Sequence, residues 1–391
     1  MIEKTDVLII GSGIIGMILA LALKNNGYKI LLVEKNSANN KNSSTNYYSK
    51  NIFLSLNSIC ILKKLKIWNF LQKKSTPIYK IHISAHKHFG KICIKRKTNK
   101  PVGYIIEANI INKILYKMID KNSIFCSSIL KKINTLKRIA TIYNIESKIK
   151  KYINFQLIVA SDGTTSSVRK IIGSESKIEK IHKQKAITAN ITIKKNYSYT
   201  AYKYFKHSES LAILPINSSQ ITIIWILPTK KAQWLLKINK EFFLKYLQKH
   251  FGYKLGKFIC ISKKRLLHQL YQSTMPKVTL WPIIFIGNAA NTLHPIGAQG
   301  FNLGLRDINT LTKYITQHKI TPKMFALYQN NREKDHKTTI NVTKIITKIF
   351  KGKSHKINFL RSLGFLAINN IKFLKKILIY YTLGYNTNLY N

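Results

Sequence analysis

Three glycines near the N-terminus have the spacing of a phosphate-binding turn. Gly11, Gly13 and Gly16 follow the β-rich run 6–10 and open an apolar helical stretch. In such a unit the first glycine permits the tight turn, the second lets the backbone approach a pyrophosphate, and the third lets helix and strand pack closely. The helix N-terminus presents free N–H groups and a positive dipole end to the phosphates. The pattern therefore predicts a dinucleotide-binding turn.

An acidic residue closes the second β-rich run of this unit. Glu34 follows the apolar run 29–33, eighteen residues after Gly16. An acid at about this distance accepts hydrogen bonds from a ribose hydroxyl in dinucleotide-binding units. The alternative is a glycine-rich turn that binds no ligand, but the strand, helix and acid in register favour the ribose-binding interpretation.

A parallel sheet and a second domain are needed to carry these motifs. The runs 155–160 and 283–286 are typical of buried parallel strands, and residues 52–71 follow a helical pattern. Residues 78–89 alternate, and short β-rich runs recur from about 186 to 227, as in an antiparallel sheet. We therefore expect an α/β chain with a largely antiparallel domain inserted in the first.

The composition is strongly basic. Among 391 residues there are 66 Lys and Arg against 14 Asp and Glu, a net charge of +52, and apolar residues make up 45%. The apolar content excludes general disorder, and the length favours at least two domains. The charge could mark a nucleic-acid or anionic-membrane partner. Because the lysines have no focus along the chain, we favour Lys spread over tolerant sites and expect no nucleic-acid partner.

Cysteine and hydrophobic patterns narrow the class further. The four cysteines lie far apart, with no CxxC pair and no nearby His at metal-ligand spacing, so we expect no metal site and no disulfide framework. The apolar stretch 7–23 is broken by glycines, which indicates strand, turn and helix rather than a spanning segment. The stretch 357–383 carries Arg361 and three lysines, which favours an amphipathic helix pair.

Three separated segments together resemble one family. The glycine-rich turn with Glu34, the segment from Ser161 to Arg169 and the segment from Gly287 to Asp307 resemble, in order, the motifs of the FAD-dependent aromatic hydroxylases. Within them the chain most resembles the ubiquinone-biosynthesis hydroxylases of the type that acts on 2-polyprenyl-6-methoxyphenol. The resemblance covers essentially the full length, and scarce charged residues fall on matching positions, among them Asp307, Asp335, Arg306, Arg332 and Arg361.

The resemblance implies an FAD site. The glycine-rich turn would hold the pyrophosphate, Glu34 the ribose and Asn288 the ribityl chain. The loop from Gly297 to Asn302 would direct N–H groups at the pyrimidine end of the flavin, where negative charge collects on reduction. The implied cofactor-binding residues are Gly11, Gly13, Gly16, Glu34, Lys50, Asp162, Gly163, Gly287, Asn288, Pro295, Gly297, Ala298, Gln299, Gly300 and Asn302. No metal is implied.

Three of these positions depart from the family pattern. Lys50 stands where the family has Arg, and it supplies charge without a bidentate fork. The family's Ala-Gly order is reversed at Gly297 and Ala298, so Ala298 is strained by about 1 to 2 kcal/mol if that position needs a positive φ. No catalytic acid or base is identified: His294 is a candidate by position only, and a structural role is its alternative.

The fold that the resemblance implies is a Rossmann-like FAD-binding domain with an inserted, mainly antiparallel β substrate domain and a C-terminal helical segment. We expect the FAD-binding domain at 1–75, 102–178 and 276–330, the substrate domain at 76–101 and 179–275, and C-terminal helices at 331–391.

The activity that the resemblance implies is monooxygenation of a polyprenylphenol in ubiquinone biosynthesis. NAD(P)H would reduce the FAD, O₂ would add to give a flavin hydroperoxide, and one oxygen atom would enter the aromatic ring. Expected partners are the polyprenylated phenol, a membrane surface and other quinone-biosynthesis enzymes. The expected location is cytoplasmic, peripheral on the inner face of the cytoplasmic membrane.

Two alternatives stay open at this point. The chain could be a sister hydroxylase that acts on another ring position of the same pathway. It could also be a scaffold that keeps the flavoprotein fold in a biosynthetic complex without turnover, although the glycines at the proposed cofactor contacts argue against this.

Overall fold

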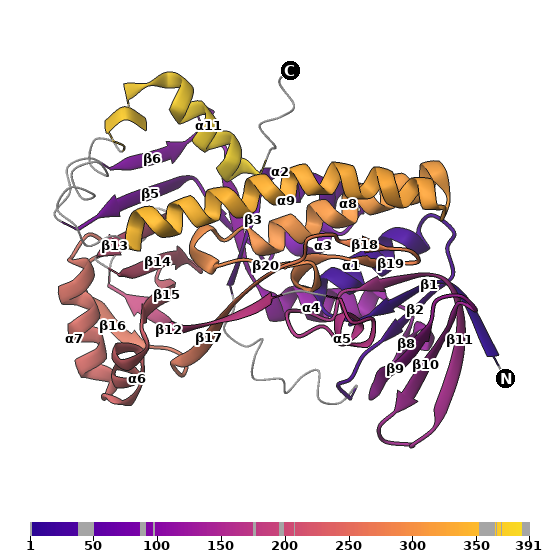
Figure 1. Ribbon diagram of the computed structural model, residues 1–391. Coiled ribbons are helices and arrows are strands. Elements are labelled where there is room, and N and C mark those ends of the chain that lie inside the picture. Colours follow the sequence, from indigo (N-terminus) through magenta and orange to yellow (C-terminus); the bar gives the residue numbers. More distant parts are fainter. Residues whose placement is uncertain are drawn as a thin grey trace.

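The structure consists of two β-sheet lobes, and the long helix α9 (Pro322–Lys351) runs across both of them (Figure 1). It is a computed structural model. It describes residues 2–37, 51–86, 91–96, 98–174, 177–194, 199–206, 208–351, 364, 366–368 and 370–384.

The first lobe contains a sheet whose described strands number eight. The order is β18-β19-β11-β1-β2-β8, with β10 beside β11 and β9 beside β10. Four neighbouring strands, β2, β1, β11 and β19, run parallel. The bounds are β1 Ile2–Ile10, β2 Ile30–Val33, β8 Ile124–Phe125, β9 Ser128–Asn134, β10 Ile139–Asn144, β11 Lys150–Ala160, β18 Thr279–Leu280 and β19 Ile283–Phe285.

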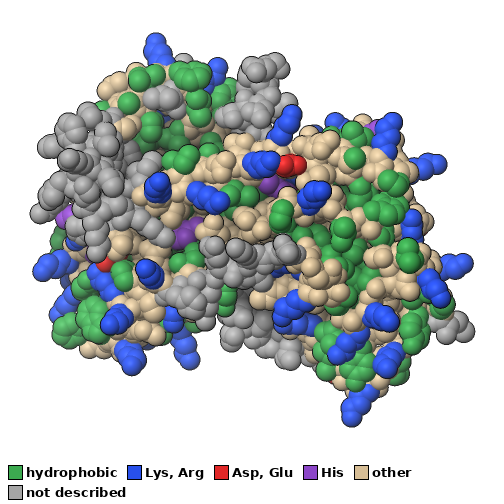
Figure 2. Space-filling view, viewed as in Figure 1, with side chains coloured by type: hydrophobic (Ala, Val, Ile, Leu, Met, Phe, Trp, Pro, Cys, Tyr) green, Lys and Arg blue, Asp and Glu red, His purple; other side chains and the backbone are tan. Residues whose placement is uncertain are grey.

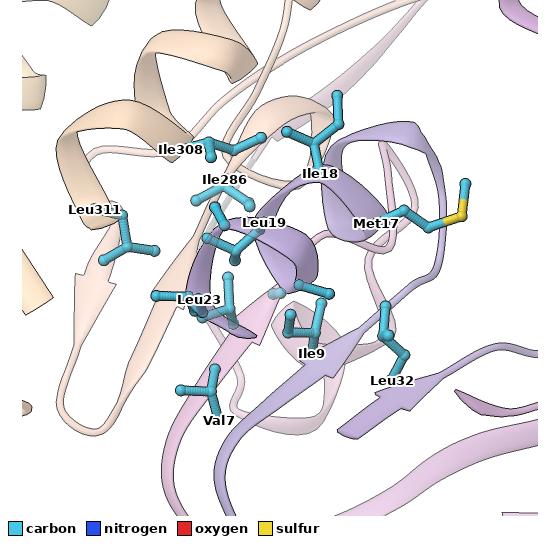
Figure 3. Packing of buried hydrophobic residues seen from close by; sticks show 14 of the residues in the cluster. Val7, Ile9, Met17, Ile18, Leu19, Leu23, Leu32, Ile286, Ile308 and Leu311 are labelled. Carbon is cyan, nitrogen blue, oxygen red and sulfur yellow. The ribbon is translucent and has the colours of Figure 1, made fainter. Parts of the chain in front are cut away.

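Helices cover this sheet and explain its continuous apolar runs. Helix α1 (Ile14–Lys24) is buried along nearly its whole length between the sheet and helix α8 (Gly300–His318). Its Met17 and Leu19 lie in one cluster with Ile9 of β1 and Ile308 of α8 (Figure 3). Further helices of the lobe are α2 Leu56–Lys64, α3 Trp68–Gln72, α4 Ala108–Met118 and α5 Ser167–Ile171.

The second lobe contains a sheet of nine described strands in the order β20-β17-β12-β15-β14-β13-β5-β6, with β16 beside β12. Its pairs are antiparallel except for β13 with β5. The bounds are β5 Lys80–Ala85, β6 Ile92–Lys95, β12 Lys177–Ile193, β13 Thr200–Lys206, β14 Glu209–Pro215, β15 Gln220–Pro228, β16 Phe258–Ile261, β17 Leu266–Thr274 and β20 Asn291–Thr292.

The two faces of the second sheet have different covers. Helices α6 (Thr229–Lys237) and α7 (Lys240–Phe251) pack on one face through a cluster that includes Trp225 and Phe243. Toward the other face, helix α11 (Lys372–Leu383) lies over β5 and β6 (Figure 1) and contacts them through Leu378 and Ile379. The α/β fold with a mainly antiparallel second sheet and C-terminal helices is as expected.

Some expected boundaries differ from the observed elements. Residues Asn51–Ser55 form strand β3, which pairs with β7 (Gly103–Glu107) instead of beginning a helix at residue 52. Strand β4 (Thr76–Ile78) also pairs with β7, so β3, β7 and β4 lie in one sheet. The predicted boundary between 330 and 331 falls inside α9, because the helix continues unbroken along α8.

A buried charge cluster joins α8 to α9. Arg332 of α9 donates to Asp307 of α8 at 2.8 Å and lies 2.6 Å from Asp335, which also pairs with Arg306 at 2.8 Å. The His336 ring is 2.7 Å from Asp307. Burial alone would raise the pKa of Asp307 and Asp335, but the neighbouring cations hold both pKa values below the usual range. Both carboxyls therefore stay ionised in the folded protein.

We predict that Arg332→Met destabilises the protein by about 3 to 5 kcal/mol, because it leaves two buried carboxylates without their shared cation. Chemical denaturation measures the free energy of unfolding. The matched control is Lys337→Met on the same helix, whose exposed pair with Glu333 should contribute nothing measurable.

The same cluster determines how the loss of stability in Arg332→Met depends on pH. Carboxyls with a lowered folded pKa stabilise the protein above their unfolded pKa of about 3.9, and that contribution is lost as pH falls. The difference between wild type and Arg332→Met should therefore shrink in acid. A deficit that is equal at pH 7 and pH 3, or no deficit at all, would contradict the assignment.

Candidate functional site

The predicted motifs meet at one edge of the first sheet. The glycine-rich turn follows β1, Glu34 follows β2, Asp162 follows β11, and Gly287 follows Ile286 at the end of β19. These four strands are parallel neighbours, so their carboxyl ends share one edge of the sheet. Open α/β sheets bind ligands in a crevice outside such an edge, and the region outside this edge is called the crevice below.

The glycine-rich turn leaves no room for side chains on its inner side. Gly11 has φ +98°, and a Cβ there would lie 2.8 Å from the backbone of Ser161. A Cβ on Gly16 would lie 2.1 Å from the carbonyl oxygen of Gly11. Gly13 is the extended N-cap of α1, without a side-chain hydrogen bond to the helix. The first N–H groups of α1 therefore point into the crevice without an intrahelical partner.

Glu34 lies directly against this turn. One carboxylate oxygen accepts hydrogen bonds from the N–H and the hydroxyl of Ser12, at 3.0 and 2.9 Å, and the other accepts from the N–H of Asn36 at 3.1 Å. These contacts fix the acid at the mouth of the crevice. Sequence reasoning missed Ser12, whose only signal was its place between two glycines.

Asp162 and Gly163 form the third side of the crevice. One oxygen of Asp162 caps α5 by accepting from the N–H and hydroxyl of Ser167, at 2.6 and 2.8 Å. Within the described part of the chain, its other oxygen is buried without a hydrogen-bond partner. Gly163 has φ +82° and open space where a Cβ would be. The backbone here is shaped for close approach of a ligand.

The turn after β19 is held by the buried charge cluster. The N–H of Gly287, which has φ +56°, donates to Asp307 at 3.0 Å. A Cβ on Gly304 of α8 would lie 2.9 Å from the Ile15 side chain of α1, so both helices approach this turn closely. The Asn288 side chain is exposed and faces Gly300, at 4.0 Å from its Cβ position.

The loop before α8 has the strain expected from its reversed sequence. Pro295–Gly297 forms a short 3₁₀ turn, and Ala298 then adopts φ 51°, ψ 27°. This left-handed conformation costs a residue with a Cβ about 1 to 2 kcal/mol. Gln299 is the N-cap of α8 without a side-chain cap. The N-terminal N–H groups of α8 therefore face the same space as this loop.

The side chain of Asn302, at the end of this loop, is held inside the protein. Its side chain is fully buried. Its oxygen accepts from Ser55 N and Ser58 Oγ, at 3.0 and 2.7 Å, while its amide nitrogen donates to the carbonyls of Phe53 and Ala298, both at 3.0 Å. All hydrogen-bonding capacity of the side chain is used within the protein, so only its main chain could contact a ligand.

A cavity of about 500 Å³ opens beside this loop. Its floor is the face of the second sheet, and its lining is mostly apolar, as with Ile83 and Leu214. Residues Pro295 to Gln299 form one wall. Leu378 and Tyr381 of α11 form another wall, and the Tyr381 carbonyl accepts from the Gln299 side chain at 3.4 Å. The space suits an apolar ring compound held against the loop.

Sequence reasoning did not find the cavity. The short β-rich runs between 186 and 227 indicated an antiparallel sheet, but nothing in the sequence showed that a helix near residue 380 covers one of its faces. His294 is 5% exposed and is absent from the cavity lining. Lys50 and Arg361 lie outside the described residues.

Two features are absent from the described residues. No group of three or more His, Cys, Asp and Glu side chains is placed to hold a metal ion. None of the described helices is both long and apolar enough to cross a membrane.

Comparison with known proteins agrees with the geometry. Residues 4–334 match the family model described as FAD binding domain. The chain is 22% identical to a ubiquinone hydroxylase of Rhodospirillum rubrum, covering 98% of this chain and 90% of that protein. It is also 22% identical to the 3-demethoxyubiquinol 3-hydroxylase of Escherichia coli, covering 98% and 99%.

A solved structure shares the fold. The probable FAD-dependent monooxygenase PqsL of Pseudomonas aeruginosa superposes with a TM-score of 0.75 at 13% identity, over 93% of this chain and all of that one. The crevice, with its positive-φ glycines, two helix N-termini without side-chain caps and neighbouring cavity, fits FAD as the cofactor. The expected resemblance is confirmed: this chain belongs to the FAD binding domain family, and it is an FAD-dependent monooxygenase.

Proposed function

We propose that this enzyme hydroxylates the aromatic ring of a polyprenylphenol in ubiquinone biosynthesis. The observation that carries the proposal is the apolar cavity, which begins at the loop Pro295 to Gln299 and continues along the second sheet. A lipid-tailed phenol needs such an apolar space, with its ring against the flavin loop. Relatives named as ubiquinone hydroxylases support the same substrate class.

The residue roles that we propose follow from the crevice. Gly11, Gly13 and Gly16 hold the pyrophosphate, and Glu34 holds the ribose. Asp162 and Gly163 lie beside the phosphates, and Gly287 and Asn288 beside the ribityl chain. The loop of Pro295, Gly297, Ala298, Gln299 and Gly300 faces the flavin ring, while Asn302 acts through its main chain.

Bound FAD supplies the redox chemistry, in which NAD(P)H gives two electrons and O₂ gives one oxygen atom to the ring and one to water. The protein's own part is to bind, orient and exclude water. The loop N–H groups stabilise negative charge at the adjoining ring edge. The apolar sheet face and α11 keep water from the reacting atoms and hold the substrate ring near the loop.

We predict that Glu34→Ala weakens FAD binding about 10- to 100-fold, because a charge-assisted hydrogen bond to the ribose is lost. Titration of the apoprotein with FAD, followed by flavin fluorescence, measures the dissociation constant. Asp120→Ala is the control, since the exposed Asp120 carboxylate of the same lobe pairs with Lys24 and accepts from the N–H of Asn122, and neither contact involves the glycine-rich turn. Unchanged FAD affinity in Glu34→Ala would contradict the role of Glu34.

Expression in strains that each lack one quinone-ring hydroxylase tests the reaction itself. We expect rescue of one strain, with its accumulated precursor converted to the hydroxylated product, as identified by mass spectrometry. That strain also identifies the ring position. Ala212→Trp, which fills the cavity floor, should abolish rescue while the purified variant keeps its flavin. Rescue of no strain would overturn the proposed function.

We also propose that the protein binds peripherally to the inner face of the cytoplasmic membrane. In this proposal helix α11 contacts the anionic lipid surface. Its outer side exposes Phe373 and Ile377, at 69% and 38%, and Tyr380 continues this stripe one turn later. Lys372 and Lys376 flank the stripe. Since the inner side of the same helix lines the cavity, this placement brings a lipid-dissolved substrate to the cavity wall.

We predict co-sedimentation with phosphatidylglycerol-containing vesicles at low salt and its loss at high salt, because lysines near anionic lipid each contribute about 1 kcal/mol. Phe373→Ser should weaken this binding about tenfold, as expected for one large apolar side chain. Phe242→Ser on α7, where Phe242 is 64% exposed, is the matched control. A wild-type protein that stays in the supernatant at low salt, or equal effects of the two variants, would contradict the proposal.

A further inference from the structure

A lysine stands on the apolar floor of the cavity. Along β13, Ala201, Lys203 and Phe205 line the cavity, together with Tyr202, whose ring contacts Phe251 of α7 on the other face. The alternating residues Tyr202 and Tyr204 pack into the cluster that faces α6 and α7. Period-two alternation thus directs Lys203 toward the space that we assign to the substrate ring.

The neighbours of Lys203 offer it no negative charge. In the sheet it pairs with Ile83 on one side and Ala212 on the other, and its ammonium lies 5.7 Å from the centre of the Phe205 ring. Glu209, the carboxylate nearest in the sequence, pairs with Lys231 and lies 3.7 Å from His250. Across the described residues, no hydrogen bond or ion pair joins Lys203 to another side chain.

A cation in such a place is costly without a counter-charge. Burial lowers the pKa of Lys203 to about 8, because the low-dielectric surroundings disfavour the ammonium form. The side chain keeps some accessible surface, and that surface faces the cavity. A ligand in the cavity can therefore supply the counter-charge that the ammonium of Lys203 lacks among its neighbours.

We propose that Lys203 binds the phenolic oxygen of the substrate as phenolate and so determines which ring carbon faces the flavin loop. The inference rests on the proposed function. In the step that forms the pair, the phenol O–H bond breaks and its proton passes to the Lys203 amine when that is neutral, or to solvent when Lys203 is already an ammonium. Either route leaves an ammonium beside a phenolate. Phenolate oxygen raises the electron density at the ortho and para carbons, where electrophilic oxygen attacks. One contact then both orients and activates the ring.

Binding of 4-nitrophenol to the FAD-loaded enzyme without NAD(P)H tests the proposal, because this phenol absorbs at longer wavelength when ionised. We expect the wild type to bind it as phenolate and Lys203→Met to bind it about 10- to 100-fold more weakly. Lys203→Arg should restore much of the affinity. 4-Nitroanisole, which has no ionisable hydroxyl, should bind wild type and Lys203→Met equally, and Lys206→Met is the control on the same strand.

Two results would overturn the assignment: equal affinity of wild type and Lys203→Met for 4-nitrophenolate, or binding of the un-ionised phenol by the wild type. Equal FAD content and equal 4-nitroanisole binding show that the variant is folded and its cavity intact. The test needs neither turnover nor a quinone precursor. A failure to rescue any hydroxylase-deficient strain would therefore refute the proposed function without removing a measured phenolate site at Lys203.

Discussion

The carboxylate of Asp307 joins three separate parts of the chain. It accepts the N–H of Gly287 at 3.0 Å, the guanidinium of Arg332 at 2.8 Å and the ring of His336 at 2.7 Å. The turn after β19, helix α8 and helix α9 are thereby held at fixed positions. Because a buried carboxylate is tolerated only when it is paired and hydrogen-bonded, these contacts must form together. The N-terminus of α8 is thus held next to the cofactor crevice.

The cavity depends on this placement. With α8 and α9 fixed, the loop at Ala298 lies against the second sheet, and α11 closes the space from the other side. Asn57 of α2 donates to the carbonyl of Gly384 at 2.9 Å, which holds the end of α11. The free-energy cost of the left-handed conformation at Ala298 is small compared with the contacts that hold the loop. Ala298 therefore adopts this conformation despite the reversed glycine order.

The large positive charge has a local rather than a global meaning. Lys and Arg side chains are spread over the whole visible face, without a single patch (Figure 2). The charges that organise the molecule are few and buried, such as Arg332, Asp307 and Asp335. Among the exposed lysines, Lys372 and Lys376 of α11 lie beside the apolar stripe of that helix. Lys203 differs from both groups, since it is enclosed by apolar neighbours and faces the cavity.

The sequence by itself determined the local features of the cofactor site. Turns that need positive φ or close backbone approach restrict residue type directly, so Gly11 and Gly16 were found by spacing alone. Gly163 and the conditional expectation of a positive φ at Ala298 came from the family resemblance. The sequence did not reveal the internal use of the Asn302 side chain, the continuation of α9 past residue 330, or the cavity. These depend on contacts between segments far apart in the chain, such as α11 with β5 and β6. A period-two pattern places Lys203 on one face of a strand, but only the tertiary structure decides what covers that face, because packing is set by surfaces that the local sequence does not contain.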